Sequence, residues 1–467
     1  MQIIAILKHE KPLNFQPFNL LHPFIIMSKK NLLMAVLITT AMGIQGSSPD
    51  DTRLQLTMSL ESLFRKADEH NTSIRSFQSA IAEAEAGIKA AKSERLPDVD
   101  ASASFSYLGG GRITDRNFTN GFGVHIPHYG NNFALQASWA VYTGGAIQSG
   151  INMSRLSAEM AKSSAEENTQ RVRMLITGFY LQLHNLYNQE SVFDENIALT
   201  ETLIAHTQKR QSEGVVLKND ITRYELQLEN LKLGKTQVQN RIRVINHQLL
   251  TALGMNEEVN ILTTDAFEIN DRMLEEETFW QQTAADNAPA LQSSQLGIEM
   301  SEEKTKLEKS QRRPSIAIMA EEHLDGPITV EIPNLNKNLN YFFVGVGVKY
   351  RFGALYKNNH RIRQAKLATQ TAQDQHAALS EQIENAVQAA YINYQTTLSE
   401  LETSKKSVEL AQQNYDVITN RYQNGLALVT DMIDAANQRL DAQLALVNSR
   451  INLLYNYYNL KYITGTL

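Results

Sequence analysis

RQSEGVVLKND (residues 210–220) and RYQNGLALVTD (residues 421–431) decide the fold of this chain, because the second stretch repeats the first. In both stretches an arginine, a glycine, a leucine and an aspartate occupy matching positions, 211 residues apart. The match holds without a gap when residues 180–254 are laid on residues 391–465. The chain therefore contains two copies of one structural unit, and an account of its function must use both.

Long helices are predicted on both sides of each repeated stretch. Proline, which breaks helices, is absent between Pro127 and Pro289 and again after Pro333. Within these windows apolar residues recur at spacings of three and four, as from Ile383 to Tyr422, which is typical of a coiled-coil seam. At 1.5 Å per residue the longest helices reach roughly 100 Å and the short ones roughly 50 Å, so two stacked short helices match one long helix. We expect helices over residues 60–94, 146–212, 217–253, 278–311, 355–423 and 428–463.

Two segments between the predicted helices alternate in the manner of β-hairpins, at residues 98–142 and 315–352. In residues 99–107, 133–141 and 342–352 every second residue is apolar or aromatic. Such alternation over about 10 residues is what a transmembrane β-strand requires. A half-buried sheet of a soluble protein shows the same alternation. An export signal, and the lack of another core for these strands to cover, favour membrane strands.

That export signal is predicted at the N-terminus. The residues MSKK (27–30) form a charged segment, and residues 32–44 form an apolar segment. We predict a leader and signal peptide over residues 1–46, with Met27 as the start of translation. A short membrane anchor is the alternative, but the apolar run is shorter than the roughly 20 residues of a membrane helix.

The repeat divides the remaining chain into two units. The first spans residues 50–254 and the second spans residues 278–467, and each contains one hairpin. Residues 255–277 break the heptad pattern, and we interpret them as a small irregular belt beside the helices.

Composition excludes several classes of function. The net charge of −6 and pI near 6.0 exclude the basic face that a nucleic-acid partner requires. Cysteine is absent, so disulfides and thiolate metal sites are excluded. His125 and His128 have metal-ligand spacing, but the neighbouring Pro127 indicates a loop between strands. We find no nucleophile-base pair and no catalytic carboxylate pair, and we predict neither an enzyme nor a bound metal or cofactor.

Four amphipathic strands per chain predict an oligomer, because an open sheet edge is not tolerated in lipid. Two copies would give eight strands, whose interior fills with side chains. Three copies would give twelve strands around a polar lumen, above a ring of helices. We therefore predict a homotrimer in contact with membrane lipid.

Several motifs spread over the whole predicted mature chain resemble those of one known family. They are RYQNGLALVTDMIDA (421–435), Gln438, Ala442, YITG (462–465), YTGG (142–145), Pro97 and Pro314. With the internal repeat, they make the chain similar to the TolC-like outer-membrane efflux proteins.

The resemblance implies a mainly α fold with a transmembrane β-barrel: a homotrimer with a 12-stranded barrel in the outer membrane and a 12-helix α-barrel in the periplasm. It implies a passive channel of a tripartite efflux or type I secretion system. The expected partners are a periplasmic adaptor (membrane fusion) protein and an inner-membrane transporter.

The resemblance also assigns roles at the ends of the long helices. Gly214 and Gly425 are expected to form the tip turns, and Asp431 with Asp434 to form a cation-selective ring at the periplasmic entrance. Asp220 and Tyr422 match a latch that holds the closed state in this family.

Two points about this gate remain open in the sequence. Asp220 also fits a simple helix-start residue near the positive end of the helix dipole. The arginine of a second family latch is replaced by Ala427, so that latch is expected to be absent.

Two rival functions remain at this stage. A soluble periplasmic coiled-coil scaffold would need protein cover over the apolar row Phe342, Val344, Val346 and Val348. A channel could instead serve protein secretion or metal export, because in this family the pump selects the cargo.

Overall fold

The computed structural model describes residues 54–255, 259–264, 275–329 and 335–467. Its contacts divide the chain into Met1–Thr52 and Arg53–Leu467, and everything below concerns the second unit. The predicted leader and signal peptide lie outside the described residues, as does much of the predicted belt.

Helices form where the sequence predicts them, with two additional breaks. The expected helix over 60–94 is interrupted at Asn71, whose side chain accepts hydrogen bonds from Ser73 N and Ile74 N and so begins a new helix. The expected helix over 278–311 is interrupted at Ala288, before Pro289. The helices are α1 (Leu60–His70), α2 (Thr72–Ser93), α3 (Ala146–Ser212), α4 (Lys218–Ala252), α5 (Glu277–Asn287), α6 (Pro289–Ser310), α7 (Ala354–Gln423) and α8 (Val429–Ile463).

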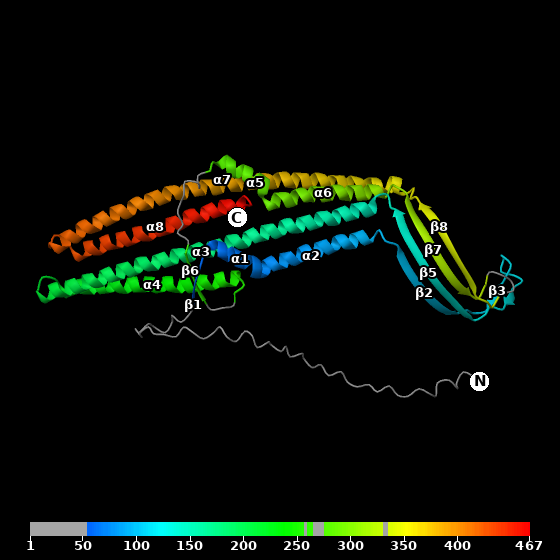
Figure 1. The fold of residues 1–467 in the computed structure, drawn as a ribbon, viewed down its shortest axis with the longest axis horizontal. Helices are drawn as coiled ribbons and strands as arrows, with labels where there is room; N and C mark the ends of the chain where they lie inside the picture. The colour runs from blue at the N-terminus through cyan, green and yellow to red at the C-terminus, as the bar shows by residue number, and fades with distance from the viewer. Residues whose placement is uncertain (1–53, 256–258, 265–274, 330–334) are drawn as a thin grey trace, which may run out of the picture. The chain divides into compact units, whose positions relative to one another are not determined.

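The short helices lie along the long ones in a fixed order. The helices α2 and α4 both pack on α3, and α6 and α8 both pack between α3 and α7. Figure 1 shows this order, with α2 followed by α4 on one side of α3 and α7 on the far side of α6 and α8. The end-to-end matching of short and long helices is thus confirmed.

Heptad spacing of buried residues explains the packing. On α7 the buried residues Val387, Tyr394 and Leu401 are seven residues apart, and Tyr415 and Tyr422 continue the same row. Side chains at this spacing stay on one face of a left-handed supercoil. The coiled-coil seam predicted from the sequence is therefore present.

A small clasp holds the middle of the helices together. Strand β1 (Leu54–Met58) pairs in parallel with β6 (Val259–Thr263). Strand β6 lies within residues 255–277, the segment interpreted from the sequence as an irregular belt. The buried Tyr180 of α3 donates its hydroxyl to Met58 O at 2.9 Å. Asn246 of α4 forms two hydrogen bonds with the backbone of β6, donating to Val259 O and accepting from Ile261 N. Sequence reasoning missed these strands because they are short and pair across some 200 residues of chain.

Four long strands form one antiparallel sheet in the order β2-β5-β7-β8. The two predicted hairpins are joined by the pairing of β5 with β7. Among the described strands, β2 and β8 each leave one edge unpaired. The strands are β2 (Asp98–Tyr107), β5 (Tyr129–Tyr142), β7 (Ser315–Gly326) and β8 (Leu339–Lys349), and β3 (Gly111–Ile113) pairs with β4 (Phe122–Val124) in a separate small sheet.

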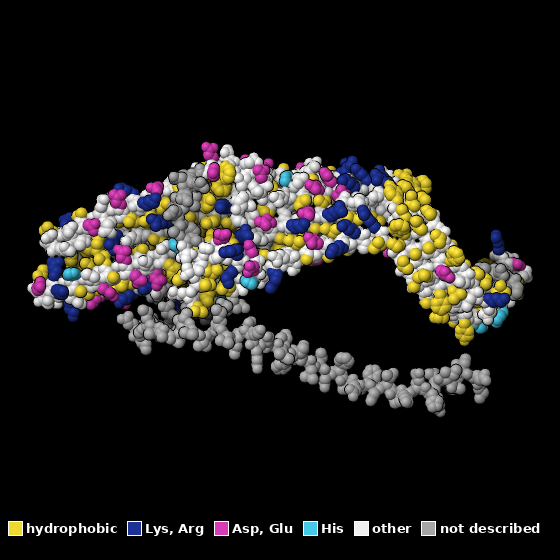
Figure 2. All heavy atoms as spheres, viewed as in Figure 1, with side chains coloured by type: hydrophobic (Ala, Val, Ile, Leu, Met, Phe, Trp, Pro, Cys, Tyr) yellow, Lys and Arg dark blue, Asp and Glu magenta, His cyan; other side chains and the backbone are white. Residues whose placement is uncertain are grey.

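The register of the sheet separates an apolar face from a polar face. Trp139, Ile318 and Val346 lie in one cross-strand row of the apolar face. Phe342, Val344, Val346 and Val348 are 68–75% exposed, so no described part of this chain covers them. Figure 2 shows hydrophobic side chains gathered over the strands, whereas charged side chains dot the helices.

Two details depart from a regular alternation. The register between β5 and β7 shifts between Ala140 and Tyr142, so Tyr142 pairs with Ile316 and Val141 is left as a bulge. Glu322 pairs with Leu135 and Phe342, which places an exposed carboxylate in the apolar face. Among the described residues, no helix is long and apolar enough to cross a membrane.

Candidate functional site

The two predicted tip turns have the same backbone geometry. Gly214 and Gly425 have φ of +76° and +73°, a conformation that favours glycine, and an added Cβ at either position would meet open space. Val215 N donates to Arg210 O at 2.9 Å, and Leu426 N donates to Arg421 O at 2.8 Å. Glycine is therefore required here by backbone conformation and not by packing, in the Schellman motif that ends many helices.

The aspartate six residues after each glycine caps the following helix. Asp220 Oδ2 accepts from Leu217 N at 3.2 Å, and Asp431 Oδ2 accepts from Leu428 N at 2.9 Å. This is the helix-start role left open for Asp220 by the sequence, and Asp431 shares it. These capping bonds involve one carboxylate oxygen of each aspartate.

Asp431 and Asp434 are both exposed near the start of α8. Residues three apart on a helix are neighbours on its surface. Asp434 Oδ2 accepts from Gln438 Nε2 at 2.8 Å. No lysine or arginine of the described chain forms an ion pair with either aspartate, so both charges are open to a counter-ion from solution.

Within one chain, the predicted latch residue Tyr422 lies in a small aromatic cluster. Its ring meets that of Tyr224 edge to face, with centroids 6.5 Å apart. The Arg210 guanidinium lies 5.3 Å from the centre of the Tyr422 ring, and its Nη1 donates to Tyr422 O at 3.3 Å. These contacts join the ends of α3 and α7 to the start of α4.

Two hydroxyls in this cluster are buried. Tyr224 Oη and Tyr422 Oη are both buried and interact with each other. Burial raises the pKa of Tyr224, and the neighbouring Tyr422, Tyr415 and Asp220 raise it further. Tyr224 is therefore a neutral donor at any physiological pH, and Asp220 is close enough to influence it.

The two repeated arginines differ in what they bind. Arg210 reaches from α3 to α7, whereas the exposed Arg421 turns back on its own turn, with Nη2 3.5 Å from Leu426 O. Ala427, which replaces the family arginine, packs against the apolar cluster around Tyr422. Arg210, the contact of Tyr224 with Tyr422, and the hydrogen bond from Gln227 Nε2 to Asn437 Oδ1 at 2.6 Å together form a first tie between the halves at this end.

A second tie lies further along the helices and escaped sequence reasoning. Arg439 of α8 is buried, with its guanidinium 4.5 Å from the centre of the Tyr415 ring of α7. Its Nη2 donates to Asn196 Oδ1 of α3 at 3.0 Å. The signal was available, because Arg439 occupies the heptad position of Met432 and Leu453, which are core residues.

His125 and His128 lie in the loop between β4 and β5. The rings of His125 and His128 are 6.0 Å apart, and His128 Nδ1 lies 2.8 Å from Leu108 O. In the residues that the structure describes, no group of three or more histidine, cysteine, aspartate or glutamate side chains could hold a metal ion.

Known proteins resemble this chain both in sequence and in fold. Its residues 63–255 and 280–466 match the outer membrane efflux protein family. Outer membrane protein TolC from Salmonella enteritidis and TolC from Escherichia coli K12 are each 28% identical over 109 residues, or 23% of this chain. That match spans 22% of the length of these relatives.

Solved structures share the fold over most of the chain. The outer membrane protein VceC from Vibrio cholerae has a TM-score of 0.69 at 16% identity, covering 87% of this chain and 96% of VceC. The CmeC outer membrane channel of Campylobacter jejuni has a TM-score of 0.68 at 16% identity, covering 87% of this chain and 85% of CmeC. Because the family match covers both repeats, the chain belongs to the outer membrane efflux protein family.

Proposed function

We propose that three copies of this chain form an outer-membrane channel that passively conducts cargo out of the cell. The sheets of three copies close into a twelve-stranded barrel, and their helices form a periplasmic tunnel below it. The observation that carries this proposal is the bare apolar row from Phe342 to Val348, which no described part of the chain covers. A soluble scaffold would leave this row in water, whereas a membrane barrel places it against lipid.

Closure by identical copies is supported by two matching edges. The strands and the helices are arranged in the same order from one edge of the chain to the other. At one edge β2 follows α2, and at the other edge β8 leads into α7. On α4, Leu226 and Leu233 are exposed seven residues apart, and on α7 Leu410 and Val417 are exposed at the same spacing. We infer that β2 pairs with β8, and α4 packs on α7, of the next copy.

The entrance is proposed at the ends of α7 and α8. Asp431 and Asp434 from three copies would place six carboxylates around the axis, which attracts cations. Opening requires the ends of α7 and α8 to move away from α3, and this movement breaks the contacts of Arg210 with Tyr422 and of Arg439 with Asn196.

The tip turns are the proposed docking site for a periplasmic adaptor protein that links the channel to an inner-membrane transporter. Val215, Leu217, Leu426 and Leu428 are each at least 60% exposed there. Apolar side chains grouped at an exposed end suit a protein partner. We also propose the domain organisation that the sequence predicts: a leader and signal peptide over residues 1–46, and structural repeats over residues 50–254 and 278–467.

The test is fractionation followed by mass measurement in mild detergent and conductance in a planar bilayer. We expect a trimer from the outer-membrane fraction that forms cation-preferring channels. Recovery of a monomer from the soluble periplasm would exclude the proposal.

A further inference from the structure

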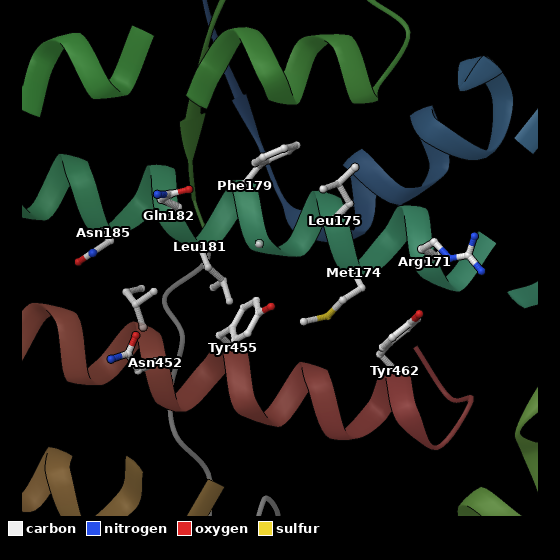
Figure 3. Close-up of a pocket in the computed structure, with 12 residues that line it drawn as sticks. Arg171, Met174, Leu175, Phe179, Leu181, Gln182, Asn185, Asn452, Tyr455 and Tyr462 are labelled. Carbon is white, nitrogen blue, oxygen red and sulfur yellow. The ribbon is translucent and has the colours of Figure 1, made fainter. Parts of the chain in front are cut away.

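A groove between α3 and α8 lies away from both the tip and the sheet (Figure 3). Figure 3 shows Tyr455 reaching from α8 toward α3, whereas Leu175, Phe179 and Gln182 lie along the edge of α3 farther from α8. The groove has a volume of about 600 Å³, within the range of roughly 300–1,000 Å³ for sites that hold drug-sized molecules. Its α3 wall includes Leu175, Gly178 and Gln182, and its α8 wall includes Asn452 and Tyr455.

The groove lies on a different side of α3 from the clasp core, and Phe179 at its edge also packs against that core. Ile176, Tyr180 and Leu183 are fully buried in the core that β1 and β6 complete. Leu175, Gly178 and Gln182 form a separate stripe, and at 3.6 residues per turn the two stripes lie roughly 130° apart around α3.

The heptad pattern of α8 connects the groove to the proposed entrance. One exposed heptad row starts with the proposed ring residue and ends in the groove, and a supercoil keeps such a row on one face. Under the proposed function, on which this step rests, that face lines the tunnel. Its exposed residues are Asp434, Asp441, Asn448 and Tyr455, and the half-buried Tyr462 continues the row.

The glycine at position 178 indicates that the open space in the groove does not result from a packing requirement. Glycine inside a helix is destabilising relative to alanine. An added Cβ at Gly178 would lie 3.7 Å from Tyr455 Cε2, which is an ordinary contact, so packing does not require glycine here. Glycine does leave the floor of the groove open in front of the Tyr455 ring.

The side chains of the groove define the chemistry of a ligand. Leu175 and Tyr455 are 50% and 44% exposed, and they offer an apolar and an aromatic surface. The charge of Arg171 is already paired with Glu167 at 2.8 Å, so the groove offers no unpaired charge. Gln182 and Asn452 are exposed in the groove, and the oxygens of their side-chain amides can accept a hydrogen bond.

We propose that this groove is a binding site on the tunnel wall for uncharged aromatic molecules of drug size that carry an N–H or O–H donor. The aromatic part lies in front of Gly178, between Leu175 and Tyr455, and the donor points toward the amides of Gln182 and Asn452. Three such sites per trimer would give cargo of this class a resting place above the acidic entrance.

The test uses the purified trimer in a planar bilayer, with N-phenyl-1-naphthylamine as the probe. This uncharged aromatic amine has one N–H donor. We expect it to interrupt the single-channel current in a saturable way. Gly178→Leu fills the groove and should raise the half-saturating concentration at least tenfold, while the open conductance remains. Tyr455→Ala, which removes the aromatic wall, should weaken the interruptions in the same direction.

Gly150→Leu is the matched control, because Gly150 occupies the same heptad position of α3 four heptads earlier and an added Cβ there meets open space. The control should behave as the parent. An unchanged half-saturating concentration in both Gly178→Leu and Tyr455→Ala, or an equal loss in Gly150→Leu, overturns the proposal.

The failure of the channel itself is a separate outcome. If no trimer forms or no current flows, the proposed function fails. The groove lies within one chain, so the fluorescence of the same probe then tests it on the purified protein. Saturable enhancement that Gly178→Leu removes supports the site, and enhancement that is equal in both proteins rejects it.

Discussion

At the scale of residues, this protein places polar groups where its helices would otherwise hold only apolar ones. Arg439 and Asn196 are both buried, and each satisfies part of the other's hydrogen-bonding capacity across α8 and α3. A buried polar pair of this kind contributes little net stability, but removing one partner is costly. Such pairs also fix the register of neighbouring helices, which matters in a seam that the proposed opening would separate and close again.

Arg439→Ala is expected to destabilise the helical region by about 2–4 kcal/mol, because Asn196 loses its donor and the Tyr415 ring loses its cation. Thermal unfolding followed by far-ultraviolet circular dichroism measures this. Arg450→Ala, on the exposed part of α8, is the control and should change little. Equal melting temperatures for both variants would show that the Arg439 contact carries no stability.

Tyr422→Phe is expected to raise the conductance of the closed channel. The Tyr422 hydroxyl is buried beside Tyr224, which Asp220 also influences, so its loss should loosen the contact between α7 and α4 that is proposed to hold the tip closed. Single-channel recordings measure the effect. Tyr415→Phe is the control, as a buried tyrosine of the same row of α7. A closed conductance equal to that of the parent would remove the hydroxyl from the latch.

At the scale of elements, the sheet shows how alternation becomes a two-faced surface. The pairing register between neighbouring strands aligns apolar residues in rows on a single face of the sheet. One such row is Trp139, Ile318 and Val346. A slip by one residue would exchange the faces. The bulge at Val141 lets Tyr142 return to the face of Trp139 next to the helices.

Val346→Arg is expected to abolish assembly in the membrane, whereas Gly347→Ser is tolerated. An arginine on the lipid face near the midplane costs about 2–4 kcal/mol per copy. A Cβ at Gly347 meets only the flexible end of Met319, at 2.8 Å, which can move aside. Heat-resistant trimer on a gel measures assembly. Equal tolerance at both positions would mean that the wrong face has been assigned to lipid.

Glu322→Leu is expected to keep or raise trimer stability, because it removes the carboxylate from the apolar face of β7. A charge on the lipid side is unfavourable, although less so for glutamate than for arginine. The temperature at which the trimer dissociates in detergent measures this. Glu321→Leu, on the polar face of the same strand, is the control and should not stabilise. A lower dissociation temperature for Glu322→Leu alone would show that this carboxylate has a partner in the membrane.

At the scale of the whole molecule, both repeats contribute to the two edges at which the proposed trimer would close. The first repeat supplies α4 and β2 at one edge, and the second supplies α7 and β8 at the other. The repeats are not equivalent, however. Arg210 ties α3 to α7 within the chain, while its counterpart Arg421 stays exposed at the edge proposed to meet the next copy.

The double change Asp431→Ala with Asp434→Ala is expected to remove most of the block by micromolar multivalent cations applied from the periplasmic side. The ring attracts cations through Coulomb interactions of several carboxylates at short distance. Bilayer recordings with a trivalent cation measure the block. Asp374→Ala, at an exposed position of α7, is the control. A double variant blocked as strongly as the parent would place these aspartates away from the entrance.

The sequence by itself determined the elements of this protein and their repetition. The bounds of α3 and the heptad row of α7 follow from local spacing, which residues within one helix or strand carry themselves. The tip turns could be predicted for the same reason, because the glycine conformation and the aspartate cap are local.

Only the tertiary structure decided which side chains meet. The contact of Arg439 with Asn196, the cluster of Tyr224 with Tyr422, and the groove in front of Gly178 each join residues that are far apart in the chain. Such contacts depend on the relative placement of whole helices, and no local pattern encodes them. Sequence analysis could therefore name Tyr422 as a gate residue, but it could not identify the partners that this tyrosine has within its own chain.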